Sequence, residues 1–140
     1  MTDARPLPVA DDVSKGFWQA AARHELTMAK CGQCGTFAYP PGAICCACGS
    51  TAPEFAFVAV SGKGRVRSWT TVRQALLPGF AELVPYVTVD VELAEQAELR
   101  IIGRLIDGID APLALDAKVE VCWEDVAPDL AVPAFRLTSA

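Results

Sequence analysis

The sequence lacks the segments that would direct it to a membrane or an export pathway. No apolar run approaches the ~18 residues that a membrane-spanning helix needs, and residues 1–10 lack the basic and apolar segments of a signal peptide. Hydrophobic residues make up 52% of the 140 residues and charged residues 21%, which is typical of a globular protein. We therefore expect a folded cytoplasmic protein with no membrane partner.

Residues suited to catalysis are also scarce. His24 is the only histidine, and its place near the end of an expected helix favours a surface or capping role. No serine has a well-placed histidine, and no cysteine outside the metal motif described below lies beside a plausible base. The segment Gly62-Lys63-Gly64 is too short to be a phosphate-binding loop. These absences predict a chain that is not an enzyme in its own right.

Charge is distributed unevenly along the chain. The net charge is −5, yet residues 55–81 contain four basic residues and no acidic one, and residues 82–129 contain twelve acidic residues and three basic ones. A protein that binds duplex nucleic acid is usually basic overall, because neutralising phosphates supplies most of its affinity. The balance of charge therefore argues against nucleic acid as the main partner.

The clearest motif of the sequence is formed by cysteines. Two Cys-x-x-Cys-Gly units occupy Cys31–Gly35 and Cys45–Gly49. Two residues between paired cysteines let one tight turn direct both sulfurs at one ion, and the glycine that follows accepts a positive φ. In a reducing cytoplasm this pattern favours a metal over the alternative, a pair of disulfides or redox dithiols. The ligands predicted for a structural Zn²⁺ are Cys31, Cys34, Cys45 and Cys48.

Cys45 and Cys46 are adjacent, and only one of them can be the first ligand of the second unit. Cys45 keeps the two-residue spacing to Cys48, so we predict that Cys45 binds the metal and Cys46 points away. Four protein ligands leave no position for water or substrate. Such a site supports folding rather than catalysis.

The chain divides into three expected parts. Residues 1–25 form an arm and a helix running roughly over residues 13–25, capped by Asp12 or Ser14. Residues 26–60 form the metal-binding ribbon, with short strands at residues 26–30, 36–39 and 54–60. Residues 61–140 form an all-β domain that begins after the break at residues 61–64.

The C-terminal part alternates apolar and polar residues as strands do. The pattern is clearest over residues 86–93, and it predicts further strands at residues 65–73, 98–106, 117–124 and 135–138. Gly103 suggests a bulge or a barrel bend within its strand. Five short strands with a long first loop suit a small Greek-key barrel of the OB type, while a sandwich or another small barrel fits the same pattern.

One predicted strand face carries three arginines beside a tryptophan. With strict alternation, Arg65, Arg67, Trp69 and Arg73 lie on the same face. Guanidinium groups beside an indole can hold a phosphate ester and stack a base, which would suit coenzyme A, a nucleotide or single-stranded nucleic acid. The alternative is a solvated face that balances the acidic remainder of the chain.

These motifs together resemble a family of small acyl-CoA-associated proteins in which a rubredoxin-like zinc ribbon precedes an OB-fold domain. The resemblance covers nearly the whole chain. It is carried by the two cysteine units and by the segments Phe17-Trp18, Tyr39-Pro40-Pro41, Ser61–Val66, Pro85-Tyr86-Val87 and Pro133-x-Phe135. It implies a mainly β fold composed of an N-terminal helix, the zinc ribbon and a five-stranded OB-fold barrel.

The resemblance also implies a function. Members of this family are non-catalytic subunits that assemble with thiolase-superfamily enzymes and help to shape the acyl-CoA channel. Alternative partners are MaoC-like enoyl-CoA hydratases and side-chain aldolases, and a binding module for single-stranded nucleic acid is a further alternative. The ligands of Zn²⁺ would be the four cysteines, and a coenzyme A thioester would be a shared ligand. Phe17 and Trp18 would lie in the helix that meets the partner or the pantetheine.

Overall fold

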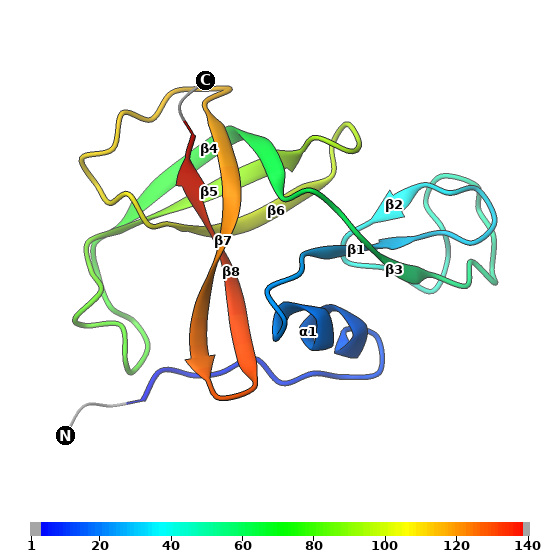
Figure 1. Ribbon diagram of the computed structural model, residues 1–140, viewed down its shortest axis with the longest axis horizontal. Coiled ribbons are helices and arrows are strands. Elements are labelled where there is room, and N and C mark those ends of the chain that lie inside the picture. The colour runs from blue at the N-terminus through cyan, green and yellow to red at the C-terminus, as the bar shows by residue number, and fades with distance from the viewer. Residues whose placement is uncertain (1–3, 139–140) are drawn as a thin grey trace.

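The structure, a computed structural model, describes residues 4–138 and is mainly β (Figure 1). A single helix is followed by a three-stranded sheet and then by a closed five-stranded barrel. The sheet and the barrel lie side by side, and α1 (Lys15–Ala21) lies below β1 (Thr27–Lys30) in this view (Figure 1). No helix in residues 4–138 is long and apolar enough to cross a membrane.

The helix α1 is shorter than the predicted range of residues 13–25, because it spans only Lys15–Ala21. At its start, the Asp11 carboxylate accepts a 2.7 Å hydrogen bond from the backbone N–H of Ser14. At its end, the N–H groups of Arg23 and Glu25 both donate to the carbonyl of Ala20. His24 then adopts a φ of 59°, in the left-handed region, which directs the chain away from the helix axis.

The small sheet has β1 (Thr27–Lys30) at its centre. β2 (Phe37–Ala38) and β3 (Ala56–Ala59) pair with it on either side, and both pairings are antiparallel. The predicted strands at residues 26–30, 36–39 and 54–60 are confirmed, and each is one to three residues shorter than predicted. These strands are short because the two cysteine turns lie between them.

The barrel contains β4 (Lys63–Val72), β5 (Tyr86–Leu93), β6 (Arg100–Leu105), β7 (Lys118–Ala127) and β8 (Leu130–Leu137). Its strand order is β4-β5-β6-β8-β7, and β7 pairs with β4 to close it. The β6–β8 pair is parallel, whereas the other pairs are antiparallel. This is the connectivity of an OB fold, so the barrel prediction is confirmed and the sandwich alternative is wrong.

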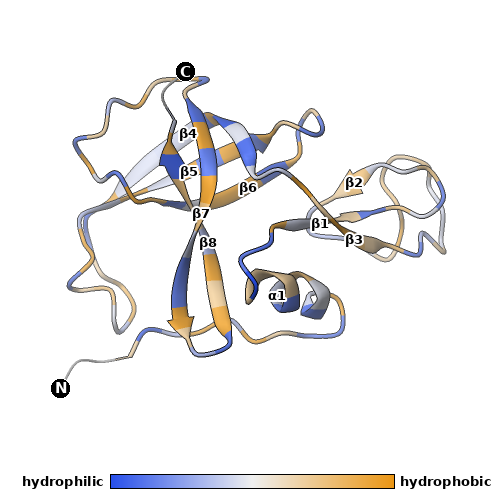
Figure 2. Ribbon diagram, in the orientation of Figure 1, coloured by the Kyte–Doolittle hydropathy of each residue, from blue (hydrophilic) through white to orange (hydrophobic). Residues whose placement is uncertain are grey.

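Alternation along the strands supplies the barrel core. The four apolar residues that alternate along β5 are all at most 2% exposed: Val87, Val89, Val91 and Leu93. Figure 2 shows this alternation as orange and blue bands along the barrel strands. The last two strands are longer than expected and form a hairpin, because the segment predicted as a strand at residues 135–138 begins at Leu130.

Gly103 does not mark a bulge, because the β5–β6 register is continuous through its pairing with Val89. A Cβ atom at Gly103 would lie 2.9 Å from Cδ2 of Phe135, the largest fully buried side chain. The glycine therefore provides space for a ring that crosses the barrel interior. Close approach, rather than backbone conformation, explains a glycine at this position.

One register shift of the barrel lies instead in β4, and another lies in the β7–β8 pair between Asp125 and Ala127. Val66 pairs with Val91, and Ser68 pairs with Asp90. Because Asp90 and Val91 are consecutive, Arg67 is an additional residue of β4 that has no partner in β5. Beyond the bulge, Trp69 pairs with Val89, whose side chain faces the core. The prediction of one continuous face from Arg65 to Arg73 is therefore wrong, since an extra residue shifts the alternation by one.

The turn between β5 and β6 joins the barrel to the small sheet. The side chain of Gln96 accepts a 2.9 Å hydrogen bond from the N–H of Phe37 and donates a 2.9 Å hydrogen bond to the carbonyl of the same residue. It thus pairs with the backbone of β2 as a neighbouring strand would. Beside it, the Glu95 carboxylate accepts a 2.7 Å hydrogen bond from the N–H of Ser61. This turn fixes the orientation of the ribbon relative to the barrel.

Candidate metal centre and barrel surface

Four sulfur atoms converge at the tip of the ribbon. Each lies within 4.8 Å of the others, and they belong to the predicted ligands Cys31, Cys34, Cys45 and Cys48. The Cys34–Cys45 Sγ distance is 3.7 Å and the Cys31–Cys48 distance is 4.0 Å. A tetrahedral Zn²⁺ with Zn–S bonds of about 2.3 Å requires sulfur atoms about 3.8 Å apart. The donor set and its spacing therefore fit a zinc ion.

The two cysteine turns have the same hydrogen bonds. In the first, the N–H of Gly35 donates to the carbonyl of Cys31 at 2.9 Å, and in the second, the N–H of Gly49 donates to the carbonyl of Cys45 at 2.8 Å. Both glycines have positive φ values, 75° and 74°. A side chain would be strained in this conformation, so the glycine after each pair is a requirement of the turn.

The surroundings of two sulfurs favour the thiolate form that a metal needs. The side chain and the backbone N–H of Thr36 lower the pKa of Cys34 to about 6. Backbone N–H groups of Cys48 and Ala47 lower the pKa of Cys45. A lower pKa means that less free energy is required to deprotonate the thiol before metal binding.

The two remaining cysteines and the histidine lie outside this cluster. Cys46 is exposed and Cys122 is half-buried on β7. His24 stacks on Trp123, with ring centroids 5.7 Å apart, and its Nε2 lies 2.7 Å from a carboxylate oxygen of Asp125. The histidine therefore connects the end of the helix to the β7–β8 hairpin.

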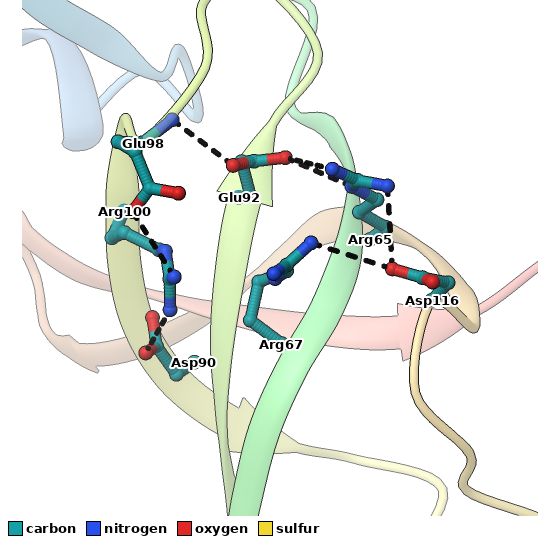
Figure 3. Close-up of polar contacts among 7 residues, drawn as sticks. All are labelled: Arg65, Arg67, Asp90, Glu92, Glu98, Arg100 and Asp116. Carbon is teal, nitrogen blue, oxygen red and sulfur yellow. Dashed lines mark hydrogen bonds and ion pairs between the residues drawn. The ribbon is translucent and has the colours of Figure 1, made fainter.

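The basic residues at the start of β4 lie in a network of ion pairs (Figure 3). Nη2 of Arg65 lies 2.7 Å from Oε1 of Glu92, and its Nη1 lies 3.3 Å from Oδ1 of Asp116. Arg67 lies 3.6 Å from the same oxygen of Asp116. The N–H of Glu98 donates to Glu92 at 3.0 Å, and this bond, together with the Arg65 guanidinium, lowers the pKa of Glu92. Carboxylates already neutralise both guanidinium groups.

The other predicted binding residues lie elsewhere. Trp69 is 42% exposed and lies beyond the bulge, and Arg73 is exposed just after the end of β4. Phe17 is only 5% exposed and belongs to the core. Trp18 contacts its ring edge-on, with centroids 5.0 Å apart, and remains half-buried. In this structure Trp18 is therefore the more accessible of the two helix aromatics.

A cavity of about 740 Å³ lies at the end of the barrel near the turn between β5 and β6. Lys63, Arg65 and Lys118 contribute positive charge to its lining, and Glu92 and Glu120 contribute negative charge. Sequence reasoning selected only Arg65 of these five. Cross-strand pairing brings the two lysines together, because Lys118 is opposite Arg65 and Lys63 is opposite Glu120. The sequence contains no direct signal of that register.

These features define a class of protein, a cysteine ribbon followed by an OB barrel, and the comparisons with known proteins give the family. Residues 18–54 match the rubredoxin-like zinc ribbon domain of ChsH2, and residues 57–124 match the C-terminal OB-fold domain of ChsH2. A DUF35 domain-containing scaffold protein of Methanocaldococcus jannaschii is 32% identical over 107 residues, which are 76% of this chain and 73% of that protein. The chain belongs to this ChsH2-like DUF35 family.

Other relatives extend the comparison. A probable enoyl-CoA hydratase alpha subunit of Thermomonospora curvata is 32% identical over 94% of this chain, but the match spans only 40% of that longer protein. Among solved structures, the Ltp2-ChsH2(DUF35) aldolase contains a chain with a TM-score of 0.79 and 28% identity, covering 93% of this chain and 98% of that one. A DUF35 protein of unknown function from Sulfolobus solfataricus has the same fold at 14% identity, with a TM-score of 0.61 and coverage of 92% and 87%.

Proposed function

We propose that this protein is a non-catalytic, zinc-binding accessory subunit that assembles with an enzyme acting on acyl-CoA. The observation that carries the proposal is the match, over nearly the full length of both chains, to the chain in the Ltp2-ChsH2(DUF35) aldolase. The Methanocaldococcus relative is named a scaffold protein, which also favours a non-catalytic role. On this proposal the partner supplies the catalytic residues.

The partner that we propose first is a thiolase-superfamily enzyme, as the family resemblance implies. Two alternatives have support in the names of relatives. The Thermomonospora relative is described as a hydratase subunit, which favours a MaoC-like enoyl-CoA hydratase. The relative of known structure is described as an aldolase, which favours a side-chain aldolase. All three partners would act on acyl thioesters.

Zinc would have a structural role in this subunit. The four thiolates complete a tetrahedral site, so the ion would have no free position for substrate. The strands of the ribbon contain two to four residues each, and the ion would hold together the two cysteine turns that lie between them. The residues that bind the metal would therefore maintain the fold of the ribbon while taking no part in the partner's reaction.

The cavity lined by Lys63, Arg65 and Lys118 is the place at which we propose contact with coenzyme A. Its volume of about 740 Å³ is within the usual range for small-molecule sites. Among the described residues, no salt bridge involves either lysine, whereas Arg65 has two carboxylate partners. The lysines are thus the better candidates for a phosphate of the cofactor.

The surface beside α1 is the place at which we propose contact with the partner enzyme. Val13 is 55% exposed, Tyr39 is 42% exposed, and both line a cavity of about 330 Å³ together with Trp18. Tyrosine and tryptophan are enriched among the residues that anchor protein interfaces. The partner would insert an apolar side chain between the helix and the ribbon.

An affinity purification tests the assembly directly. The tagged full chain is recovered from its native lysate without chelators, and a near-stoichiometric thiolase-like, hydratase-like or aldolase-like protein is expected with it. We expect Val13→Asp to reduce the recovered partner, and Leu115→Asp, an equivalent change at another exposed site (67%), to leave it unchanged. Thiolysis, condensation or hydration by the purified chain alone would refute a non-catalytic role.

A further inference from the structure

The N-terminal arm lies on the part of the barrel where OB folds bind extended ligands. Such ligands bind the face of the second and third strands, between the loop joining strands one and two and the loop joining strands four and five. Here those strands are β5 and β6, and the loops are residues 73–85 and 128–129. Figure 1 shows the arm, in dark blue, passing the tip of the β7–β8 hairpin that contains the second loop.

A cavity of about 330 Å³ shows how closely the arm approaches this face. Its lining includes Arg5, Pro6 and Pro8 from the arm. On the barrel side, the lining comes from β5 and β6, from the loop of residues 73–85 and from the β7–β8 hairpin. We call the barrel part of this surface the barrel groove, formed by Phe80, Leu83, Tyr86, Thr88, Ile102, Arg104, Glu124, Val126, Val132 and Pro133.

Arg5 makes the specific contacts. Its Nη2 lies 3.9 Å from Oε2 of Glu124, and its guanidinium carbon lies 5.6 Å from the centroid of the Phe80 ring. The backbone is close as well, since a Cβ atom added to Gly79 would lie 2.3 Å from the amide nitrogen of Arg5. The arm thus contacts the first loop and the hairpin at the same time.

The bound segment has the character of a polyproline peptide. Pro6 and Pro8 each fix φ near the value of an extended left-handed helix, which repeats every three residues. Arg5 and Pro8 are half-buried, whereas Pro6 and Leu7 are exposed, which agrees with that repeat. Aromatic grooves are the usual partners of such peptides.

The contact is also weak enough to be displaced. Among the described residues, no backbone hydrogen bond joins residues 4–10 to the barrel. The cavity shows that the arm does not fill the groove completely. What remains is one long ion pair, one cation–π contact and the packing of two prolines, and contacts of this kind between partly exposed groups are individually small.

We propose that residues 5–8 are an intramolecular peptide ligand of the barrel groove. Docked, the arm closes the groove; displaced, it leaves a site for another basic, proline-containing peptide segment, such as one supplied by a partner protein. This inference concerns the barrel groove and not the lysine-lined cavity, and it does not depend on which enzyme the protein accompanies. The cavity under the arm is also lined by Trp18 and Tyr39, so the groove adjoins the surface beside α1.

The test uses the full chain and a fluorescent peptide with the sequence of residues 4–13. Arg5→Glu removes both specific contacts, which should release the arm. We expect the labelled peptide to bind this variant at least about tenfold more tightly than the wild type, because the arm no longer competes. Arg23→Glu is the matched control, because Arg23 is exposed and, among the described residues, its guanidinium donates only to the carbonyl of Gln19 in α1.

A second substitution locates the binding. Phe80→Ala in the Arg5→Glu chain should reduce peptide affinity by about tenfold, because the ring that faces the guanidinium is lost. Thermal unfolding of each variant confirms that it is folded before binding is measured. Equal binding to the wild type and the Arg5→Glu chain would overturn the proposal. Binding that is unaffected by Phe80→Ala, or binding of oligo(dT) in place of the peptide, would overturn it as well.

Discussion

The choice between two adjacent cysteines is the sharpest test of the metal centre. Replacing Cys45 with serine removes a buried sulfur that lies 3.7 Å from Cys34 Sγ. A serine hydroxyl does not ionise at neutral pH, so the site would lose one of its four anionic ligands. The same replacement at Cys46 removes an exposed thiol that is outside the cluster.

The expected effect is large. Structural zinc ions bind small domains with roughly 10–16 kcal/mol of free energy. Shared equally among four thiolates, one ligand accounts for roughly 3–4 kcal/mol, and this corresponds to a loss of roughly 10²–10³-fold in affinity. We expect that loss for Cys45→Ser and wild-type affinity for Cys46→Ser.

Competition with a chromophoric chelator measures both affinities, and elemental analysis gives the zinc content of each purified variant. The double variant Cys45→Ser/Cys46→Ser shows whether Cys46 substitutes when its neighbour is absent. Loss of zinc from Cys46→Ser, or unchanged affinity in Cys45→Ser, would refute the assignment of ligands.

Three further predictions concern stability. Gln96→Ala should reduce the free energy of unfolding by about 1–3 kcal/mol, because two backbone hydrogen bonds to Phe37 are lost; chemical denaturation measures it. Gly103→Ala should cost about 1–3 kcal/mol by forcing a methyl group against the buried ring of Phe135, and Phe135→Leu in the same chain should reduce that cost. The lowered pKa of Glu92 stabilises the fold above the ordinary glutamate pKa, and this stabilisation is lost as pH falls through the lower folded value. Thermal melting in acid should therefore depend less on pH in Glu92→Gln.

Each of these predictions can fail clearly. An unchanged denaturation midpoint for Gln96→Ala would mean that the turn does not hold the ribbon. If Phe135→Leu did not relieve the cost of Gly103→Ala, the ring would not be the cause of that cost. Identical acid profiles for the wild type and Glu92→Gln would show that the carboxylate is not preferentially ionised in the folded state.

The sequence alone determined the features that depend on neighbouring residues. The spacing within Cys31–Gly35 and Cys45–Gly49 specifies two identical turns, because the geometry of a turn involves only a few consecutive residues. The alternation over residues 86–93 specifies β5 with its correct bounds, because side chains on a strand change faces at every residue. These local signals were enough to predict the ribbon and the strands of the C-terminal domain, but they left a sandwich open as an alternative to the OB barrel, which the family resemblance implied.

Only the tertiary structure decided which residues share a surface. The bulge at Arg67 separates Trp69 from the basic face, and its position depends on the partner strand rather than on β4 itself. The charge of Arg65 is neutralised by Glu92 and Asp116, which are far from it in the chain. The contact between the arm and the barrel groove likewise joins segments that are far apart in the chain. Such contacts depend on the register of distant segments, which is set by the packing of the whole core.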